Sequence, residues 1–318
     1  MAGNANYDTA LLSSTLEKFI EKQPVDTFFQ DLALWDWLKG TGGIKKRVDG
    51  GLKMLVPLMY AANSTVQRYS GYDTLDISPQ EGFTAAEFEI KGYNGAITIS
   101  GEDELKNAGE AQMWDLLEGK WDQLKLSFMD YLNADAYLDG TQGNGKGITG
   151  LALMIDSTGT YGNIARASNS WWAAQETAVS AALAIDGSTG MRRMYNDCSL
   201  GKGSMVPNGL LTTQAIFETY ESLMSPYLRY TVTGEGNAVF QSDNLKFRKA
   251  ALMWDEECQS GIMYFLNSKV IEMRVRKDMT TTPFQTPINQ DSKVAHVRFW
   301  GQLVAKNCRH LGKLTGIS

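Results

Sequence analysis

The sequence predicts an α+β fold, and three observations support this prediction. Apolar residues recur at mostly three- and four-residue intervals from Glu102 to Leu138, which is the spacing of one face of a long helix. Two earlier stretches, Leu52 to Val66 and Phe83 to Ile99, alternate apolar residues with others, which favours strands. Residues 151–261 then alternate short strand and helix signals.

The N-terminal segment, residues 1–37, has an amphipathic pattern that Pro24 interrupts. Several aromatic residues follow that proline. Two interpretations stay open: a helix folded onto its own domain, or an arm that lies along a neighbouring copy of the chain. The residues that define the pattern are Leu11, Leu12, Leu16, Phe19 and Ile20, followed by Phe28, Phe29, Trp35 and Trp37.

The two alternating stretches predict a ribbon of two long strands with a polar tip. The segment between them, residues 67–82, reads QRYSGYDTLDISPQEG and is rich in turn-forming residues. Strands of about fifteen residues would reach about 50 Å. Because an isolated two-stranded ribbon is only marginally stable in water, we expect it to lie on another copy of the chain.

The long helix predicted for residues 102–138 begins after Gly101 with three acidic residues, which suits the positive end of a helix dipole. It would span about 55 Å. One interpretation is a core helix of an ordinary α+β domain. The other is an elongated molecule, which favours assembly over an enclosed active-site cleft.

A glycine-rich stretch at residues 139–150, DGTQGNGKGITG, marks the clearest boundary in the chain. It does not fit a phosphate-binding loop, because Lys146 is followed by Gly147 and not by Ser or Thr. It also lacks the Rossmann glycine pattern in a strand–turn–helix setting. We therefore predict a flexible connection between two lobes.

The second lobe is predicted from short local patterns. Residues 171–184 are expected to form a helix with Asn169 or Ser170 as its cap. Further predictions are a strand at 209–213 leading into a helix at 214–224, a strand at 252–254, a strand pair at 262–275 folded about Asn267-Ser268, and a strand at 294–306.

Composition excludes several classes of protein. The 30 basic and 36 acidic residues give a net charge of −6, which disfavours broad binding to nucleic acid. Cys198, Cys258 and Cys308 are odd in number and form no metal-ligand pattern. The start of the chain does not resemble a signal peptide and no apolar run is long enough to span a membrane, so we expect a reducing cytoplasm.

Catalytic motifs are also missing. The two histidines, His296 and His310, lack metal-ligand spacing, and the neighbouring Cys308 is too close in sequence to pair with His310 as a nucleophile with its base. There is no G-x-S-x-G motif, and the acidic runs at Asp73 and Asp255 lack the calcium-loop pattern. The sequence therefore predicts a protein that is not an enzyme, with no catalytic, cofactor-binding or metal-binding residues.

Three segments together resemble the major capsid proteins of tailed bacteriophages with the HK97 fold. The first, Gly147 to Trp172, carries a Gly-Leu strand, the turn YGNIAR at 161–166 and a Trp pair. The second, Ile262 to Val275, contains MYFLN. The third, Val294 to Ile317, ends GQLVAKNCRHLGKLTGI, and the likeness runs from about Trp35 to Ser318.

The resemblance implies an HK97-like capsid fold with four parts. These are an N-terminal arm (1–47), an extended β-ribbon loop (48–95), a peripheral domain with a long spine helix (96–150 and 262–318) and an axial domain (151–261). It further implies hexamers and pentamers in an icosahedral virion shell, assembled in the host bacterial cytoplasm around double-stranded DNA. The expected inter-subunit contacts at the loop tip are Arg68, Tyr69, Tyr72 and Asp73.

The same resemblance sets expectations about partners. We expect a separate scaffolding protein, because the matching region begins within the first forty residues. A portal is also expected, and the resemblance is compatible with a decoration protein. No sequence-specific DNA binding and no membrane are implied. Lys53 lies near the ribbon base, so no covalent cross-link through it is predicted.

Two alternatives remain open at the level of sequence. One is an encapsulin-like bacterial nanocompartment shell, which shares the fold but encloses enzymes. The other, from a different class, is a soluble carbohydrate-binding or carbohydrate-active domain, which the Trp and Tyr content would suit.

Overall fold

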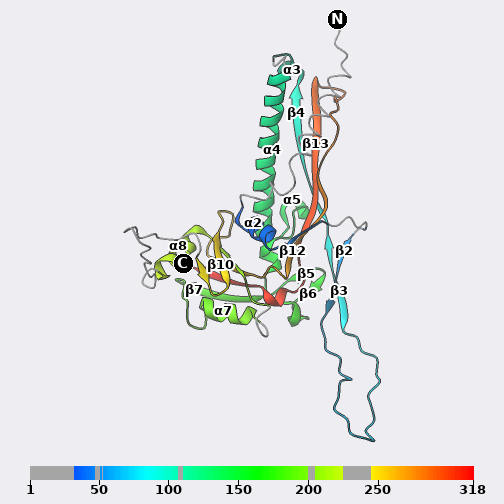
Figure 1. Cartoon of the computed structure of the whole chain (residues 1–318), viewed down its shortest axis with the longest axis vertical. Helices are drawn as coiled ribbons and strands as arrows, with labels where there is room; N and C mark the ends of the chain where they lie inside the picture. Colours follow the sequence, from blue (N-terminus) through cyan, green and yellow to red (C-terminus); the bar gives the residue numbers. More distant parts are fainter. Residues whose placement is uncertain (1–31, 47–50, 52, 107–109, 200–204, 225–244) are drawn as a thin grey trace, which may run out of the picture.

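A computed structural model describes residues 32–46, 51, 53–106, 110–199, 205–224 and 245–318. The described chain is elongated (Figure 1). A long helix and two long strands extend in one direction, a two-stranded ribbon extends in the opposite direction, and a second lobe lies to one side. Residues 1–31, which hold most of the predicted arm, lie outside the described residues.

The first half of the chain supplies the long helix and the ribbon. Its elements are α2 (Ala33–Gly40), β1 (Ile44–Lys46), β2 (Lys53–Met59), β3 (Phe83–Glu89), β4 (Lys91–Ser100), α3 (Gly101–Lys106), α4 (Glu110–Tyr137) and α5 (Gln142–Gly145). The helix predicted at 102–138 is confirmed as α3 and α4.

The second half supplies the other lobe and the closing strands. In order these are α6 (Leu151–Met154), β5 (Thr160–Tyr161), β6 (Ile164–Ala165), η2 (Ser170–Trp172), β7 (Gln175–Ala181), α7 (Met191–Cys198), β8 (Gly209–Thr212), α8 (Gln214–Met224), β9 (Lys246–Phe247) and β10 (Ala250–Trp254). They are followed by β11 (Met263–Leu266), β12 (Ile271–Thr281), β13 (Ser292–Ala305), η4 (Cys308–His310) and β14 (Gly312–Ile317).

A four-stranded sheet in the order β1-β12-β13-β4 supports the long helix. Strands β13 and β4 pair antiparallel from Ser292↔Ser100 to Gly301↔Lys91. Gly95 of β4 lies beneath Leu124 and Phe128 of α4, where a Cβ atom would come within 2.5 Å of both side chains. The absence of a side chain at Gly95 therefore lets the helix lie directly on the strand.

The second sheet has six strands in the order β7-β14-β11-β8-β10-β9. Strands β11 and β12 are consecutive, yet they belong to different sheets. The two strands predicted at 262–275 are present, but the expectation that they form one folded pair is wrong. The Asn267 carbonyl accepts hydrogen bonds from the amides of Val270 and Ile271, and this turn carries the chain from one sheet to the other.

The helix predicted at residues 171–184 is wrong. Ser170–Trp172 forms one short 3-10 turn, and Gln175–Ala181 is strand β7, which pairs parallel with β14. The C-terminal strand supplies this partner from more than a hundred residues away, so tertiary pairing overrides the local helical pattern. The predicted strand at 209–213 and helix at 214–224 are confirmed as β8 and α8.

The ribbon strands are shorter than predicted. Strands β2 and β3 have seven residues each, and residues 60–82 between them form no regular strand. The second half of the predicted 83–99 strand is β4, which leaves the ribbon and pairs with β13. The ladder of β13 takes up this segment because it buries Ile97 and Ile99.

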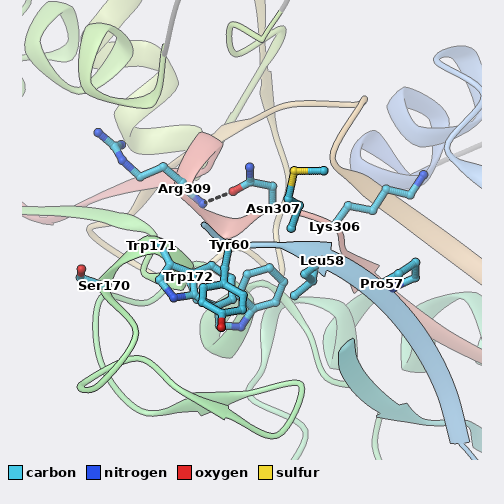
Figure 2. A pocket seen from close by; sticks show the side chains of 10 residues that line it. Pro57, Leu58, Tyr60, Ser170, Trp171, Trp172, Lys306, Asn307 and Arg309 are labelled. Atoms are coloured by element: carbon cyan, nitrogen blue, oxygen red, sulfur yellow. Dashed lines mark hydrogen bonds between the residues drawn. The ribbon is translucent and has the colours of Figure 1, made fainter. Parts of the chain in front are cut away.

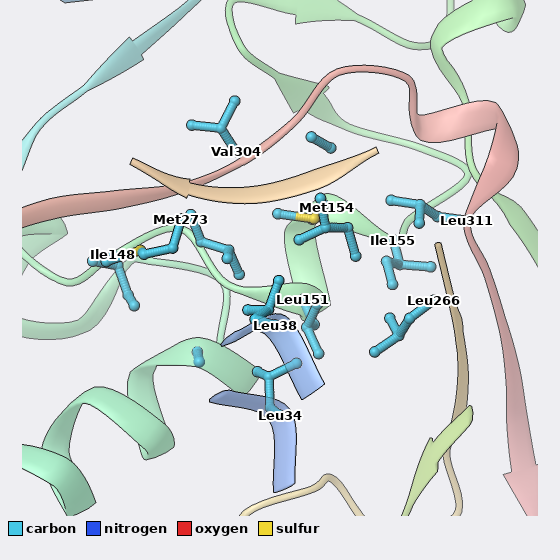
Figure 3. Packing of buried hydrophobic residues seen from close by; sticks show 14 of the residues in the cluster. Leu34, Leu38, Ile148, Leu151, Met154, Ile155, Leu266, Met273, Val304 and Leu311 are labelled. Atoms are coloured by element: carbon cyan, nitrogen blue, oxygen red, sulfur yellow. The ribbon is translucent and has the colours of Figure 1, made fainter. Parts of the chain in front are cut away.

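The main hydrophobic core lies where the sheets and helices meet (Figure 3). Leu34 and Leu38 of α2 point into it, together with Leu151 and Met154 of α6. A separate cluster that includes Met194 forms the interior of the second lobe. Burial of large apolar side chains contributes about 1.5–3 kcal/mol each, so these two clusters provide the principal stabilisation of the fold.

A buried carboxylate on β12 forms ion pairs with β1 and with the residue that follows β13. Glu272 is 3% exposed and contacts Lys45 and Lys306, each with a nitrogen–oxygen distance of 2.8 Å, as well as Arg274. Burial alone would raise its pKa, but the hydrogen bonds from Lys306, Lys45 and Arg274 outweigh burial and lower the pKa of Glu272 to about 2. Glu272 therefore stays ionised, and its ion pairs connect β12 with β1 and with Lys306 after β13.

Glu272→Gln is expected to lower the free energy of unfolding by roughly 2 to 3 kcal/mol at neutral pH. Because folding lowers the pKa, the contribution is complete above the ordinary pKa near 4.5 and is lost as the pH falls toward 2. Urea unfolding of the purified protein at pH 7 and near pH 2 should show the difference between wild type and variant shrinking in acid. A difference in unfolding free energy that does not change with pH would contradict this explanation. Glu218→Gln on α8 serves as the control.

Candidate assembly interface

The ribbon formed by β2 and β3 has apolar side chains on both faces. Its strands pair antiparallel from Lys53↔Glu89 to Met59↔Phe83. One face, with Val56, Leu58, Ala86 and Phe88, is buried against the rest of the chain. The other face carries Leu55, Met59 and Phe83, which are 56%, 71% and 75% exposed. We call this second surface the outer ribbon face.

The buried ribbon face rests on a tight turn between β5 and β6. Gly162 and Asn163 both have positive φ, at 61° and 62°, as a two-residue type I′ hairpin requires. The Glu87 amide donates to the Gly162 carbonyl at 2.9 Å. A Cβ atom at Gly162 would lie 2.9 Å from both Ala86 and Phe88, so only glycine lets the ribbon approach this closely. The predicted turn at Tyr161–Arg166 is confirmed.

Two buried side chains hold that turn in place. The Arg166 guanidinium donates to the carbonyls of Leu153 and Met154 at 2.8 Å and to that of Thr158 at 3.1 Å. Trp172 donates from its indole nitrogen to the Tyr161 carbonyl at 2.9 Å. These hydrogen bonds satisfy buried polar groups and fix the platform on which the ribbon lies.

An aromatic stack fixes the point where the ribbon leaves the body of the protein. The rings of Tyr60 and Trp171 stack with centroids 5.4 Å apart and planes 24° apart. Figure 2 shows this pair beside a groove of about 580 Å³ whose other side carries Lys306, Asn307 and Arg309. The stack lies immediately after β2, where residues 60–82 leave the body of the protein.

The four predicted contact residues lie together at the ribbon tip. Arg68, Tyr69, Tyr72 and Asp73 are exposed, and Tyr72 is as exposed as a side chain can be. The Asp73 carboxylate accepts a hydrogen bond from the Ser70 amide at 2.7 Å, which closes the turn. Contact between these residues and a neighbouring copy stays a prediction.

The tip is less polar than the sequence pattern indicated. Val66, Leu75 and Ile77 are 82%, 55% and 92% exposed. The sequence pattern placed Val66 at the end of an alternating stretch, whereas Leu75 and Ile77 were missed because they lie among turn-forming residues. These three side chains add exposed apolar area to the projection beyond the ends of β2 and β3.

The residues considered for catalysis are separated or buried. His310 contacts the Cys198 carbonyl, whereas the Cys308 sulfur contacts Arg166. Burial raises the pKa of the Cys258 and Cys308 thiols to about 12, which disfavours the reactive thiolate. In the part of the chain that the structure describes, no three His, Cys, Asp or Glu residues are placed to hold a metal ion, and no helix is long and apolar enough to cross a bilayer.

Trp171→Ala should loosen the ribbon base. Stacked aromatic pairs contribute about 1 kcal/mol, so amide hydrogen exchange in β2 and β3 should become about five-fold faster while exchange in β13 stays unchanged. Tyr131→Ala removes an exposed aromatic ring from α4 and serves as the matched control. Equal exchange in wild type and Trp171→Ala would show that the stack does not hold the ribbon.

Solved capsid structures share this architecture. A chain of the cyanophage A-1(L) capsid asymmetric unit superposes with a TM-score of 0.64 at 13% identity, covering 88% of this chain and 93% of that one. A chain of Mycobacterium phage Bobi gives 0.55 at 12% identity, covering 86% and 88%. The holo-SrpI encapsulin complex from Synechococcus elongatus PCC 7942 gives 0.54 at 9% identity, covering 88% of both chains.

Sequence comparison gives no match: no protein-family model and no curated protein matches this chain. The likeness therefore lies in three dimensions. It covers 88% of this chain in the cyanophage comparison, and phage capsid structures recur among the similar chains. The chain has the HK97-like fold of phage major capsid proteins, as its sequence pattern indicated.

Proposed function

We propose that this chain is the structural subunit of a closed icosahedral shell, built from hexamers and pentamers, that encloses the double-stranded DNA of a phage. The observation that carries the proposal is the uncovered apolar surface of the ribbon. A projecting two-stranded ribbon with exposed Met59 and Phe83 is poorly stable alone in water and gains stability when another molecule covers it.

The energetics favour a second copy as the covering molecule. Each buried apolar side chain contributes about 1.5–3 kcal/mol, and symmetry repeats every contact in each subunit of a ring. Many modest interfaces then stabilise a shell that a single pair of subunits would not maintain. The HK97-like fold of the chain is consistent with this mode of assembly.

The parts of the chain acquire roles under this proposal. We assign residues 1–47 to the N-terminal arm, 48–95 to the extended loop, 96–150 and 262–318 to the peripheral domain, and 151–261 to the axial domain. Packing and strand pairing adjust these bounds, because α2 packs in the main core, residues 91–95 of β4 pair with β13, and β11 and β14 belong to the six-stranded sheet. The shell is the virion capsid, assembled in the host cytoplasm with a separate scaffolding protein and a portal. The net charge of −6 suits a wall that encloses DNA without binding it tightly.

An encapsulin-like compartment is the second candidate, because the similar structures include an encapsulin complex. It predicts the same shell with protein cargo in place of DNA. A carbohydrate-binding function receives less support: the Tyr60 and Trp171 rings stack on each other, so they do not present a free aromatic platform to a sugar.

Electron microscopy of the protein expressed with its genomic neighbours, together with light scattering, tests the proposal. Closed angular shells or six-fold rings are expected, and nuclease-protected DNA inside them separates a phage capsid from an encapsulin-like compartment. A homogeneous monomer or dimer under all conditions would overturn shell formation.

Met59→Ser combined with Phe83→Ser should prevent most shell assembly, because both changes remove apolar area from the outer ribbon face. A loss of about ten-fold or more in shell yield is expected if each side chain contributes roughly 1 kcal/mol per subunit. Thermal unfolding of the free subunit should change little, since both side chains are exposed before assembly. Ile288→Ser, at another fully exposed apolar position, is the control.

Arg68→Ala combined with Asp73→Asn tests the predicted contacts of the tip. Asparagine retains an oxygen that can close the turn at Ser70, so the tip should keep its shape. Shell yield should fall at low salt while subunit stability is retained. An unchanged shell yield would show that Arg68 and Asp73 do not contribute to the interface.

A further inference from the structure

The chain contains three Asn-Gly pairs, at residues 94–95, 144–145 and 208–209. An asparagine followed by glycine is prone to spontaneous deamidation, because glycine has no side chain to hinder attack by its own amide nitrogen on the preceding side chain. The attack requires the backbone to rotate, so a rigid backbone protects the pair. The structure places the three pairs in very different surroundings.

Two of the pairs are held in sheets. Asn94 and Gly95 belong to the ladder between β4 and β13, and side chains of α4 cover Gly95. Gly209 lies in β8 and pairs with both β10 and β11. The side chain of Asn208 is bonded at both ends, because its Oδ1 accepts from the Ser268 amide at 2.9 Å and its Nδ2 donates to the Ser268 hydroxyl at 2.7 Å. Opening either pair therefore requires disruption of a sheet.

The third pair lies in a surface turn. Asn144 is exposed and has φ and ψ of 60° and 46°, in the left-handed region that asparagine tolerates. It belongs to α5, a single helical turn with no buried side chain. One hydrogen bond, from the Gly145 amide to the Thr141 carbonyl at 3.0 Å, restrains the attacking nitrogen. Because an isolated helical turn is only marginally stable, this hydrogen bond opens readily.

We propose that Asn144 is a site of spontaneous deamidation in the folded protein, whereas Asn94 and Asn208 are protected. The Gly145 amide nitrogen forms a bond to Asn144 Cγ, the Cγ–Nδ2 bond breaks, and the side-chain nitrogen leaves as ammonia with the proton of the Gly145 amide. Water then opens the cyclic imide, which gives aspartate when it attacks Cγ and isoaspartate when it attacks the main-chain carbonyl carbon. No oxidant or cofactor takes part. The inference goes beyond the proposed function and does not require a shell.

The modified turn adjoins the root of the ribbon. The Gly145 carbonyl accepts a hydrogen bond from Lys91 Nζ at 2.7 Å, and Lys91 also pairs with Glu89 at 3.0 Å. Glu89 ends β3 and Lys91 begins β4, so this contact lies where the ribbon joins the four-stranded sheet. Isoaspartate lengthens the main chain before Gly145 by one carbon atom, which displaces the carbonyl from Lys91. Deamidation should therefore loosen the ribbon root.

Peptide mapping by mass spectrometry tests the proposal on the full-length protein incubated in mildly alkaline buffer. Deamidation at Asn144 should be at least about ten-fold faster than at Asn94 or Asn208, because a strand opens much less often than a surface turn. In urea-unfolded protein the three rates should converge, since each site is the same pair of residues. Equal rates at the three sites of the folded protein would overturn the inference.

Asn144→Gly is the matched control, because glycine adopts a positive φ freely and has no side-chain amide to lose. Aged wild-type protein should gain a more acidic form on anion exchange, since deamidation replaces a neutral amide with a carboxylate. The variant should gain none. An acidic form of equal abundance in the variant would assign the reaction to another residue and overturn the inference.

The isoaspartate form, separated from unmodified protein, tests the effect on the ribbon root. Amide hydrogen exchange near Lys91 should be about three-fold faster than in Asn144→Gly aged in parallel, because one hydrogen bond is lost there. Exchange in β8 should stay unchanged. Equal exchange near Lys91 in the two samples would overturn the effect on the ribbon root.

Discussion

The two-stranded ribbon has apolar side chains on both faces, and the described chain covers only one of them. This constraint organises the structure. The inner face, with Ala86 and Phe88, is covered by the turn at Gly162. The outer face, with Met59 and Phe83, remains in solvent. Because hydrophobic burial is non-directional, any sufficiently large apolar surface could cover it. The rest of the fold therefore has to determine where the ribbon points.

That direction is set by rigid polar contacts beneath the ribbon. Arg166 is buried and uses its guanidinium to satisfy three backbone carbonyls, which holds the segment carrying Gly162. The stack of Tyr60 on Trp171 fixes the exit of the chain. Glu272, kept ionised by its cationic neighbours, ties β1 and the end of β13 to β12. These charged and aromatic groups add less stability than the apolar core, yet they specify the geometry.

Local patterns in the sequence predicted the elements whose stability is local. The long apolar stripe predicted α4, and a strand signal leading into an amphipathic run predicted β8 and α8. Prediction failed at residues 171–184, where β14 supplies a strand partner that no local pattern reveals. The hydrogen bond between Asn133 and Asp255 was equally hidden, because these residues are 122 positions apart in sequence. Of the candidate interface, the sequence indicated the tip residues but not the exposure of Met59 and Phe83.

The apolar outer ribbon face and the polar contacts at its base differ in how strictly they depend on geometry. Hydrophobic burial is non-directional, so the outer ribbon face could pack on another apolar surface in more than one register. The hydrogen bonds of Arg166 depend on distance and angle, so the platform beneath the ribbon tolerates little displacement. The body of the protein, and not the ribbon face, therefore restricts the angles at which a second molecule could contact the ribbon.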